Sequence, residues 1–568
     1  MTKVRSLLVA SLLLPLLAAC SKEEVTDAES GVPEPVPSGV NTYASFTFNV
    51  DAANTRAGMT GEVGDESTVK DITLLIFDGE TTDGELLNRE TATTSQSMTI
   101  ATTSGTRRMF VIANSEANAQ MKAELAALKV RADGVTATKL SEFYQLMTDP
   151  SGGTTPNPDT DMGEGFKNLM VNSALVMSNT ADASSLKTLQ PGVTKEDAAG
   201  AGKEEKKNQF SFVVRRAVSK GNLLVKIAES KITTADGAFE LKSDNITFGV
   251  RNVNRSVNYV QQFGNDKLPA VDAEDTPQLG TSKPWAAYYN VFDKTTDANM
   301  KLLATYHPYY FHGYSICKLI NTSLDEPIAA GVGLGGAAGV TSKNVYFTEN
   351  SNNRQVLGNT SYFGIATQVK EIAANKIAKA FSFDAETGLL STTAAADNYD
   401  NSLGDKDFWY IREIPLAANI KFTEGSERRV FVDETVAWSA IYTVLLRAGM
   451  ITTTEFANAD ALKTEYEQNG DTNLPNVVGG LDRYFGHYEK GVSYYRLNIY
   501  ETVDAMKRHV VRRNHQYNAV VTSFATIGEP TEEGLDKDPD KPVDAEITFV
   551  TATITVQKWH VVDMEGGI

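Results

Sequence analysis

The feature that most constrains this chain is a series of short, β-like runs between clusters of turn-forming residues. The runs are rich in Val, Ile, Leu and Phe, and Gly, Asn, Asp, Ser and Thr separate them. They include residues 72–77, 108–113, 210–215 and 223–227. Helical periodicity is predicted at 116–130, 139–147 and 433–448, the last followed by Gly449. Many strands without a regular strand–helix–strand alternation predict stacked β-sandwiches with a few inserted helices.

The first strand of the series is followed by a candidate processing site. Its apolar residues alternate with polar ones, which is the period of a half-buried strand. These apolar residues are Ala44, Phe46, Phe48 and Val50. Small and polar residues then predict an exposed loop at 52–55, followed by Arg56 and Ala57. A basic residue in an exposed loop is a site for a trypsin-like protease, and a cut after Arg56 would detach the strand.

Residues 1–20 have the pattern of an export signal. Two basic residues precede an apolar run at 7–17 that is too short to span a bilayer. The sequence Leu17-Ala18-Ala19-Cys20 resembles a bacterial lipobox, which predicts cleavage before Cys20 and acylation of its thiol. A plain signal peptide that ends near a cysteine is the alternative. The Pro-containing residues that follow, up to position 40, predict an extended or disordered tether.

Length and charge limit the classes of function. A chain of 568 residues can form two or three domains with their own cores. The formal net charge of −19 argues against a nucleic-acid partner, which requires clustered Lys and Arg. If Cys20 carries a lipid, Cys317 is the single remaining cysteine and no disulfide framework is expected.

No motif for catalysis, a cofactor or a metal stands out. Residues 331–336 fit G-x-G-x-x-G by letter, but the helix and acidic residue of a dinucleotide site do not follow. Asp536, Asp538 and Asp540 alternate as in a calcium loop, without its central Gly and terminal Glu. The six histidines have no zinc-site spacing. We therefore expect a protein that is not an enzyme and has no cofactor and no metal.

The C-terminal end contains a strand and an apolar tail. Residues 547–556 alternate as a strand that can complete the sheet of its own domain, and the alternation slips at 557–559. The slip predicts a bulge or the end of that strand. Apolar residues continue in the tail at 559–568, where a frayed terminus is the simpler interpretation. They include Trp559, Val561, Val562 and Met564.

Several motifs of the chain resemble those of the fimbrillins, the subunits of type V pili. The similarity is greatest to the structural (major) subunit of the minor, or short, fimbriae of oral Gram-negative anaerobes. The motifs lie at residues 54–58, 212–220, 347–350, 358–362, 494–496, 513–517 and 556–559. Ser219-Lys220 and Gly566-Gly567 depart from the family pattern. The resemblance implies a mainly β fold of two stacked β-sandwich (transthyretin-like) domains with a few inserted helices.

The resemblance also implies a domain order. It consists of a lipoprotein signal peptide at 1–20, a tether and removable strand at 21–56, an N-terminal sandwich at 57–215, a C-terminal sandwich at 216–558 and a donor tail at 559–568. The precursor would reach the outer membrane through its lipid, and an Arg-specific protease would remove everything through Arg56. The groove left by residues 43–51 would then receive the tail of another subunit. Residues 547–556 remain the alternative donor.

The implied partners are other copies of the chain, accessory tip and anchor pilins, the protease, and ligands on host or bacterial surfaces. The implied role is adhesion, co-aggregation and biofilm formation by cell-surface fimbriae. A surface-binding lipoprotein that does not polymerise is one alternative, and it would need an exposed aromatic platform. Candidates for such a platform are Trp285, Tyr288, Tyr289, Tyr309 and Tyr310. A tip or anchor pilin is the second alternative, and a surface hydrolase is the third.

Overall fold

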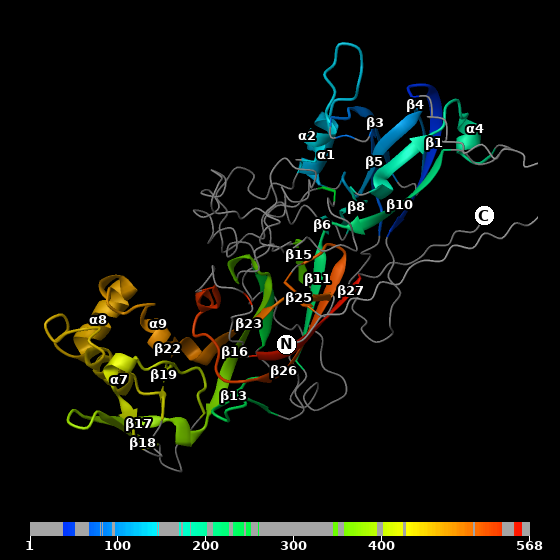
Figure 1. The fold of residues 1–568 in the computed structure, drawn as a ribbon. Coiled ribbons are helices and arrows are strands. Elements are labelled where there is room, and N and C mark those ends of the chain that lie inside the picture. Colours follow the sequence, from blue (N-terminus) through cyan, green and yellow to red (C-terminus); the bar gives the residue numbers. More distant parts are fainter. Residues whose placement is uncertain are drawn as a thin grey trace, which may run out of the picture.

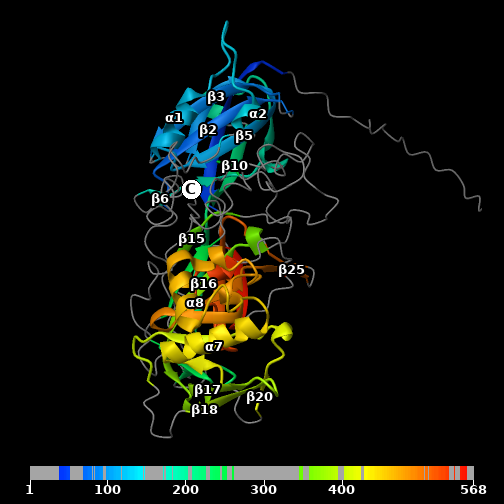
Figure 2. The same cartoon turned by 90° about the vertical axis from the view of Figure 1, so that its left-hand side faces the viewer.

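The computed structural model describes residues 38–50, 68–146, 170–260 and 345–558, with short gaps inside the last three ranges. The fold is mainly β, with several sheets and few helices, which confirms the predicted class. In Figures 1 and 2 the N-terminal strands lie at one end, and helices α7 (Glu434–Arg447) and α8 (Ala459–Asn469) lie toward the other. Across the described ranges, no helix combines the length and apolar character needed to cross a bilayer.

The N-terminal sandwich is built on a mixed sheet with the strand order β3-β2-β5-β8-β10-β1-β4, in which β9 also pairs with β5. Its strands are β1 (Asn41–Val50), β2 (Asp71–Asp78), β3 (Leu86–Thr93), β4 (Ser97–Thr103), β5 (Gly105–Ala113), β8 (Met177–Ser178), β9 (Leu186–Leu189) and β10 (Gln209–Arg216). A small hairpin of β6 (Met170–Val171) and β7 (Ala174–Leu175) and the helices α1 (Ala119–Ala127), α2 (Leu140–Phe143) and α4 (Lys195–Ala198) complete it.

One apolar core lies inside this sandwich. It joins the inward residues of β1 to those of β2, β5 and β10 and to buried residues of α1 and α2. Phe77, Phe110 and Phe143 form an aromatic cluster there, with ring centroids 5.1–6.1 Å apart. β1 thus contributes to the same core as strands far from it in the sequence.

The C-terminal sandwich packs two further sheets around a second core. The first has the order β15-β11-β26-β27, with β15 (Val345–Phe347), β11 (Ser219–Val225), β26 (His515–Phe524) and β27 (Val550–Lys558). The second has the order β12-β13-β16-β14, with β12 (Ile232–Thr233), β13 (Phe239–Leu241), β16 (Tyr362–Ile372) and β14 (Thr247–Arg251), and β23 (Val492–Asn498) also pairs with β16. A short hairpin joins β24 (Glu501–Val503) to β25 (Met506–Arg508).

A third apolar core lies in residues 378–485, within the C-terminal part of the chain, and was not predicted. Helix α7 packs there with α8 and α9 (Leu481–Tyr484) and with small sheets. One sheet has the order β17-β18-β20, with β17 (Ala378–Asp384), β18 (Leu389–Ala394) and β20 (Lys421–Phe422). The other has the order β21-β19-β22, with β21 (Val430–Phe431), β19 (Phe408–Ile411) and β22 (Phe485–Tyr488). The longest helix, α7, therefore packs with α8 and α9 around a core separate from those of the two sandwiches, whereas α1 and α2 pack on the N-terminal core.

The predicted helices are present, but two are shorter than expected. The 116–130 pattern yields α1 over nine residues, and 139–147 yields only α2, with four. The 433–448 prediction is matched by α7, because Asp433 caps its start by accepting a hydrogen bond from the backbone N–H of Val436 at 3.0 Å. Gly449 follows its end with φ +68°, a conformation that glycine adopts without strain.

Strands β10 and β11 connect the two sandwiches through only Ala217 and Val218. The crossing is buried and hydrogen-bonded to the β26 side. The guanidinium of Arg216 donates to Oδ1 of Asn514 at 3.1 Å, and the backbone N–H of Asn514 donates to the carbonyl of Val218 at 2.8 Å. β10 ends at Arg216, next to the predicted boundary at 215/216, which itself stays a prediction.

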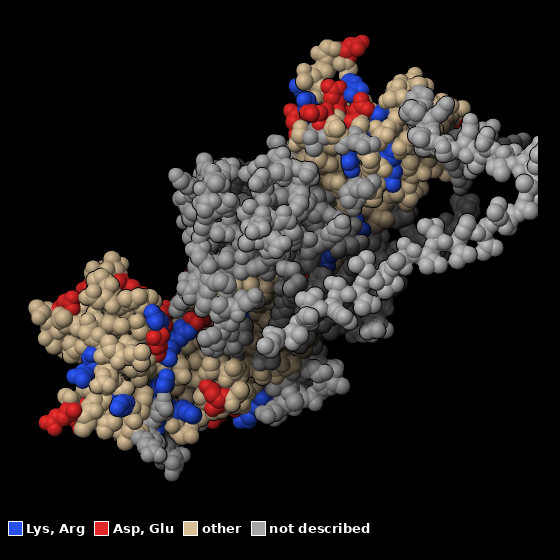
Figure 3. Space-filling model, viewed as in Figure 1, with Lys and Arg blue, Asp and Glu red and all other residues tan. Residues whose placement is uncertain are grey.

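Charged side chains of both signs are spread over the described surface. Figure 3 shows Lys and Arg interspersed with Asp and Glu on the face it displays. Several of these form ion pairs, such as Arg131 with Asp78 and Glu85, each at 2.6 Å. Exposed pairs of this kind contribute little to stability.

Candidate functional site

The candidate site is the groove that holds β1, whose backbone is paired on both sides. On one side β1 runs parallel to β10, from Ser45 opposite Gln209 to Val50 opposite Val214. On the other it runs antiparallel to β4, from Asn41 opposite Thr103 to Thr47 opposite Ser97. β1 therefore bridges two strands that have no direct pairing with each other. Without it, two rows of backbone hydrogen-bonding groups would lose their partners.

The side chains of β1 follow the predicted alternation. Ala44 and Phe46 have no exposed surface and Phe48 is 6% exposed, whereas Thr47 between them is exposed. The ring of Phe46 stacks on those of Phe210 and Phe212, with centroids 6.0 and 6.3 Å away. A fully buried apolar side chain stabilises a fold by roughly 1.5–3 kcal/mol. The groove is therefore lined by apolar side chains, and the inward side chains of β1 fill it.

The N-terminal end of the groove is polar. The hydroxyl of Thr42 is buried among residues of the loop after β9 and the residue before β10. It donates to the carbonyl of Gln190 at 2.7 Å and accepts from the N–H of Val193 at 3.1 Å and from Nδ2 of Asn208 at 2.9 Å. The backbone of β1 continues this contact, because the N–H of Ser45 donates to the carbonyl of Asn208 at 2.9 Å.

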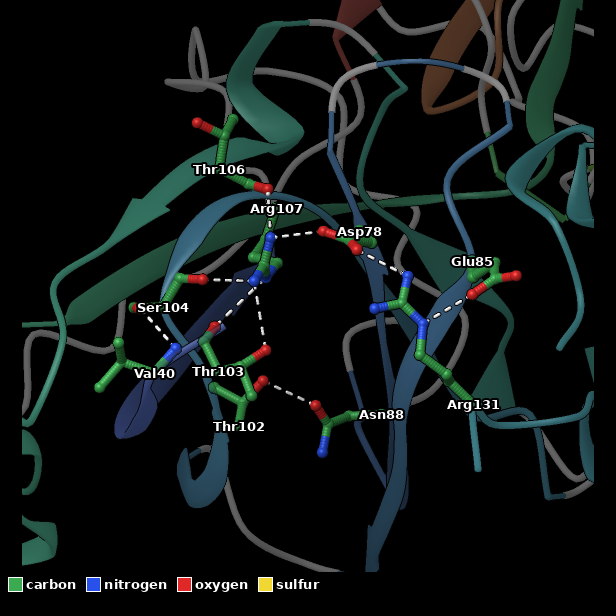
Figure 4. Close-up of polar contacts among 10 residues, drawn as sticks. All are labelled: Val40, Asp78, Glu85, Asn88, Thr102, Thr103, Ser104, Thr106, Arg107 and Arg131. Carbon is green, nitrogen blue, oxygen red and sulfur yellow. Dashed lines mark hydrogen bonds and ion pairs between the residues drawn. The ribbon is translucent and has the colours of Figure 1, made fainter. Parts of the chain in front are cut away.

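The segment just before β1 is held at the corner between β4 and β5 (Figure 4). The N–H of Val40 donates to Oγ of Ser104 at 3.1 Å, and the N–H of Ser104 donates to the carbonyl of Val40 at 2.8 Å. Gly105 has φ +114°, and a Cβ built there would lie 2.8 Å from Oγ of Ser38. A larger residue at 105 would therefore be strained and would displace the chain that leads into β1.

A buried arginine supports this corner from behind. The guanidinium of Arg107 donates to the carbonyl of Ser104, to the carbonyl and hydroxyl of Thr103 at 3.2 Å each, and to a carboxylate oxygen of Asp78 at 2.6 Å. Burial lowers the pKa of Arg107, and the Asp78 carboxylate opposes that shift. Because an arginine stays charged in proteins, the buried Arg107 guanidinium remains a donor to these four acceptors.

Several predicted site residues fall outside the described part of the chain. These are Cys20, Arg56, Ala57, Trp559, Val561, Val562 and Met564, together with the aromatic platform candidates. Val50 closes β1 opposite Val214, but its side chain is not described. Of the predicted residues, the structure therefore brings together Ala44, Phe46 and Phe48. Arg107 is a second arginine after which a trypsin-like protease could cut, but it lies in β5 and is only 2% exposed.

Four further residues of the groove were not singled out from the sequence: Thr42, Ser104, Arg107 and Asn208. Thr42 lies two residues before Ala44 and so faces the same side of the strand. A threonine is also common on the outer face of a strand, so the sequence alone did not single it out. Asn208 has φ +54°, which asparagine tolerates better than most residues. Its partners lie far away in the sequence, so that only the fold could identify it.

The strand near the C-terminal end differs from the prediction in one respect. β27 covers Val550–Lys558 and pairs with β26, so residues 550–556 of the segment predicted at 547–556 complete their own sheet, and residues 547–549 lie outside the described residues. The expected slip at 557–559 does not begin within the pairing, because Gln557 and Lys558 continue the register opposite Gln516 and His515. The irregularity lies instead on β26, between Val521 and Ser523, where Thr522 is the extra residue of a bulge.

Within the described residues, no group of three or more His, Cys, Asp or Glu side chains is placed to hold a metal ion. Two of the histidines interact locally. His487 stacks on Trp409 with ring centroids 4.7 Å apart, and Nδ1 of His515 lies 2.9 Å from the carbonyl of Arg513. These contacts account for both histidines structurally.

Comparisons with known proteins match both ends of this described region. Residues 43–208 match the family model of the major fimbrial subunit protein (FimA), and residues 486–565 match that of the fimbrillin C-terminal region of the major fimbrial subunit protein type IV. The first match covers the N-terminal sandwich from within β1 to the residue before β10, and the second includes β26 and β27. No curated protein matches the chain.

Solved structures with similarity to the chain include a fimbrilin (fimA) from Porphyromonas gingivalis, at 13% identity and a TM-score of 0.37, covering 92% of this chain and 99% of that one. A second is a putative cell adhesion protein from Bacteroides eggerthii, at 10% identity and a TM-score of 0.37, covering 92% and 97%. A third is a tip fimbrial protein from Porphyromonas gingivalis with a C-terminal truncation, at 12% identity and a TM-score of 0.31, covering 91% and 100%.

Proposed function

We propose that this chain, a fimbrial protein that resembles the fimbrillins, is a structural subunit that polymerises by protease-triggered strand exchange. The two family matches support the coarse assignment, since they cover the sandwich that holds β1 and the strands that lead to the tail. A structural role in a fimbria requires no catalytic site, so the family also suggests a protein that is not an enzyme.

The observation that carries the proposal is the position of β1. It lies inside a sheet, hydrogen-bonded to β10 and β4, yet it belongs to a segment that continues into the rest of the chain only through residues 51–67. That connection contains Arg56. A single cut there leaves β1 held by non-covalent contacts alone, although the sheet depends on it for its buried backbone partners.

The proposed sequence of events follows from this arrangement. The precursor is anchored in the outer membrane by a lipid on Cys20, and an Arg-specific protease cuts between Arg56 and Ala57. β1 leaves, and residues 559–568 of another copy enter the groove with Trp559, Val561, Val562 and Met564 as the apolar side chains. Because β27 keeps its place beside β26, the tail beyond Lys558 can serve a neighbour without opening its own sheet.

The mature subunits then form a head-to-tail polymer at the cell surface, to which accessory tip and anchor pilins are added. Such fimbriae support adhesion, co-aggregation and biofilm formation through ligands on host or bacterial surfaces. Residues 547–556 are the less favoured donor, since most of that segment already pairs with β26 as β27.

N-terminal sequencing of the surface form tests the cleavage step, and the expected first residue is Ala57. The matched variant Arg56→Ala should remain full-length after Cys20 and should form no filaments in the electron microscope. A mature surface form that begins at Cys20, or normal filaments from Arg56→Ala, would contradict the proposal. Arg131→Ala is the control, because it changes an exposed arginine and should leave processing unaltered. Arg216 is unsuitable for this purpose because its side chain is buried.

A further inference from the structure

A hydroxyl group occupies the polar end of the groove. A threonine hydroxyl has one proton to donate and two lone pairs that accept. At Thr42 all three are used, on the carbonyl of Gln190, the N–H of Val193 and Nδ2 of Asn208. We name these four residues, Thr42, Gln190, Val193 and Asn208, the hydroxyl clamp.

Asn208 gives the clamp a fixed orientation. Its Oδ1 accepts from the N–H of Gln190 at 2.7 Å, so that Nδ2 must face the strand. Nδ2 lies 2.9 Å from the Thr42 hydroxyl, 3.1 Å from the carbonyl of Tyr43 and 2.9 Å from the carbonyl of Gln190. The amide is therefore held by the loop and the strand together, and it contacts both the backbone and the side chain of the bound strand.

A strand that lacks a hydroxyl at this position would fit the clamp poorly. Val and Thr have nearly the same shape, but Val can neither accept from Val193 nor donate to Gln190. A buried N–H that loses its acceptor destabilises the bound strand, because the group has left water without gaining another partner. The remaining inward positions of β1 are filled by Ala44, Phe46 and Phe48, which any strand with apolar side chains of suitable size can imitate.

We propose that the hydroxyl clamp is the specificity-determining position of the groove and favours a strand that carries Ser or Thr at the register of Thr42. This inference rests on the proposed strand exchange. The occupant that satisfies the clamp is the chain's own β1, whereas the tail at 559–568 contains no Ser or Thr. The clamp thus retains β1 against the tail of another copy, and release of β1 after the cut at Arg56 becomes the slow step of exchange.

The rate at which the cleaved N-terminal segment leaves the full-length chain tests the clamp. The chain is cut with an Arg-specific protease, and loss of the segment that ends at Arg56 is followed by size-exclusion chromatography with mass spectrometry. A synthetic peptide of residues 559–568 is added as the competitor. Thr42→Val should accelerate release by roughly ten- to hundredfold, as the lost hydrogen bonds imply. Thr42→Ser, which keeps the hydroxyl, should release within about threefold of the natural rate.

Thr47→Val is the matched control, because Thr47 lies on the same strand with an exposed side chain, whose hydroxyl makes a single long hydrogen bond, of 3.4 Å, to the carbonyl of Phe210. It should release at the natural rate. Equal release from Thr42→Val and Thr47→Val would overturn the clamp.

Asn208→Gly provides the second arm, since glycine accepts the positive φ of this position without the amide side chain. On that background the difference between Thr and Val at 42 should shrink severalfold, which a double-mutant cycle measures. An undiminished difference would show that Asn208 does not contribute, contrary to the proposal. If Thr42→Val does not fold, the release rates of Thr42→Ser and Asn208→Gly still test the clamp. Asn208→Gly alone should accelerate release, and Thr42→Ser should not.

The outcome for polymerisation is separate from the outcome for the clamp. If the natural chain releases β1 but forms no filaments, strand exchange fails as its function while the order of release rates still supports the clamp. If filaments form and the Thr42 variants release alike, polymerisation stands and the clamp is wrong.

Discussion

The first and last strands of the described fold close their sheets in different ways. β1 has hydrogen-bonded neighbours on both sides, and its Phe46 is fully buried. β27 lies at the end of its sheet order, pairs with β26 alone among the described strands, and leaves Ile554 8% exposed. Loss of β1 would open two rows of backbone groups, and loss of β27 would open one. The N-terminal sheet is therefore the one that cannot remain without a replacement strand.

The difference also separates two tasks. An edge strand such as β27 can lead out of its sheet without disturbing the core, so the chain beyond it is available to another molecule. An interior strand such as β1 cannot be exchanged unless its own segment is released. The proposed strand exchange therefore requires cleavage at one end of the chain only.

Phe46→Asp should have the largest effect on this contrast. A carboxylate without a partner in the apolar groove is unfavourable by several kcal/mol, so the N-terminal sandwich of the uncleaved chain should unfold. Hydrogen exchange measured by mass spectrometry should show lost protection in β10 and β4 and intact protection in β26. Thr47→Asp, on the exposed face of the same strand, is the control. Retained protection in β10 would place Phe46 outside the core.

Substitution by alanine should destabilise β1 more than β27. Phe46→Ala should lower the free energy of unfolding of its sandwich by about 3–5 kcal/mol, and Ile554→Ala that of its sandwich by about 2–3 kcal/mol. Ile554 lies on an edge strand and leaves a site that can partly close. Urea unfolding of the two uncleaved variants measures both values. A larger effect at Ile554 would reverse the proposed ranking of the two strands.

Deletion of residues 559–568 should leave stability within about 0.5 kcal/mol of the natural chain, because β27 still closes the C-terminal sheet. It should nevertheless abolish filaments. Trp559→Asp should behave in the same way if Trp559 enters a neighbour. Circular dichroism and size-exclusion chromatography distinguish a folded monomer from an unfolded one. Normal filaments from the truncated chain would exclude the tail as donor and favour residues 547–556.

Cys20→Ala should have the smallest effect on the fold, with an unchanged unfolding transition, because residue 20 precedes every described strand. It should block lipidation and, with it, assembly at the cell surface. Metabolic labelling with a fatty acid measures the first effect, and immunogold microscopy of intact cells measures the second. Assembly at the natural level would contradict the lipoprotein hypothesis.

Local patterns predicted the strand at residues 44–50 and the start of α7, because alternation and capping act between near neighbours. The parallel pairing of β1 with β10 was not predictable in this way, since its partners, such as Ser45 and Gln209, lie far apart in the sequence. The groove depends on that pairing. The hydroxyl clamp was missed for the same reason, and the third core was missed because α8 is polar over most of its surface.

The short crossing between β10 and β11 has a mechanical consequence for any filament built in this way. Tension applied between the groove and the tail must pass from the strand that replaces β1 to β10, through Ala217 and Val218 to β11, and across β26 to β27. In each lateral step the strands lie side by side along several residues, so the load pulls on many hydrogen bonds in shear rather than opening them one after another. The helical core at residues 378–485 lies outside this path.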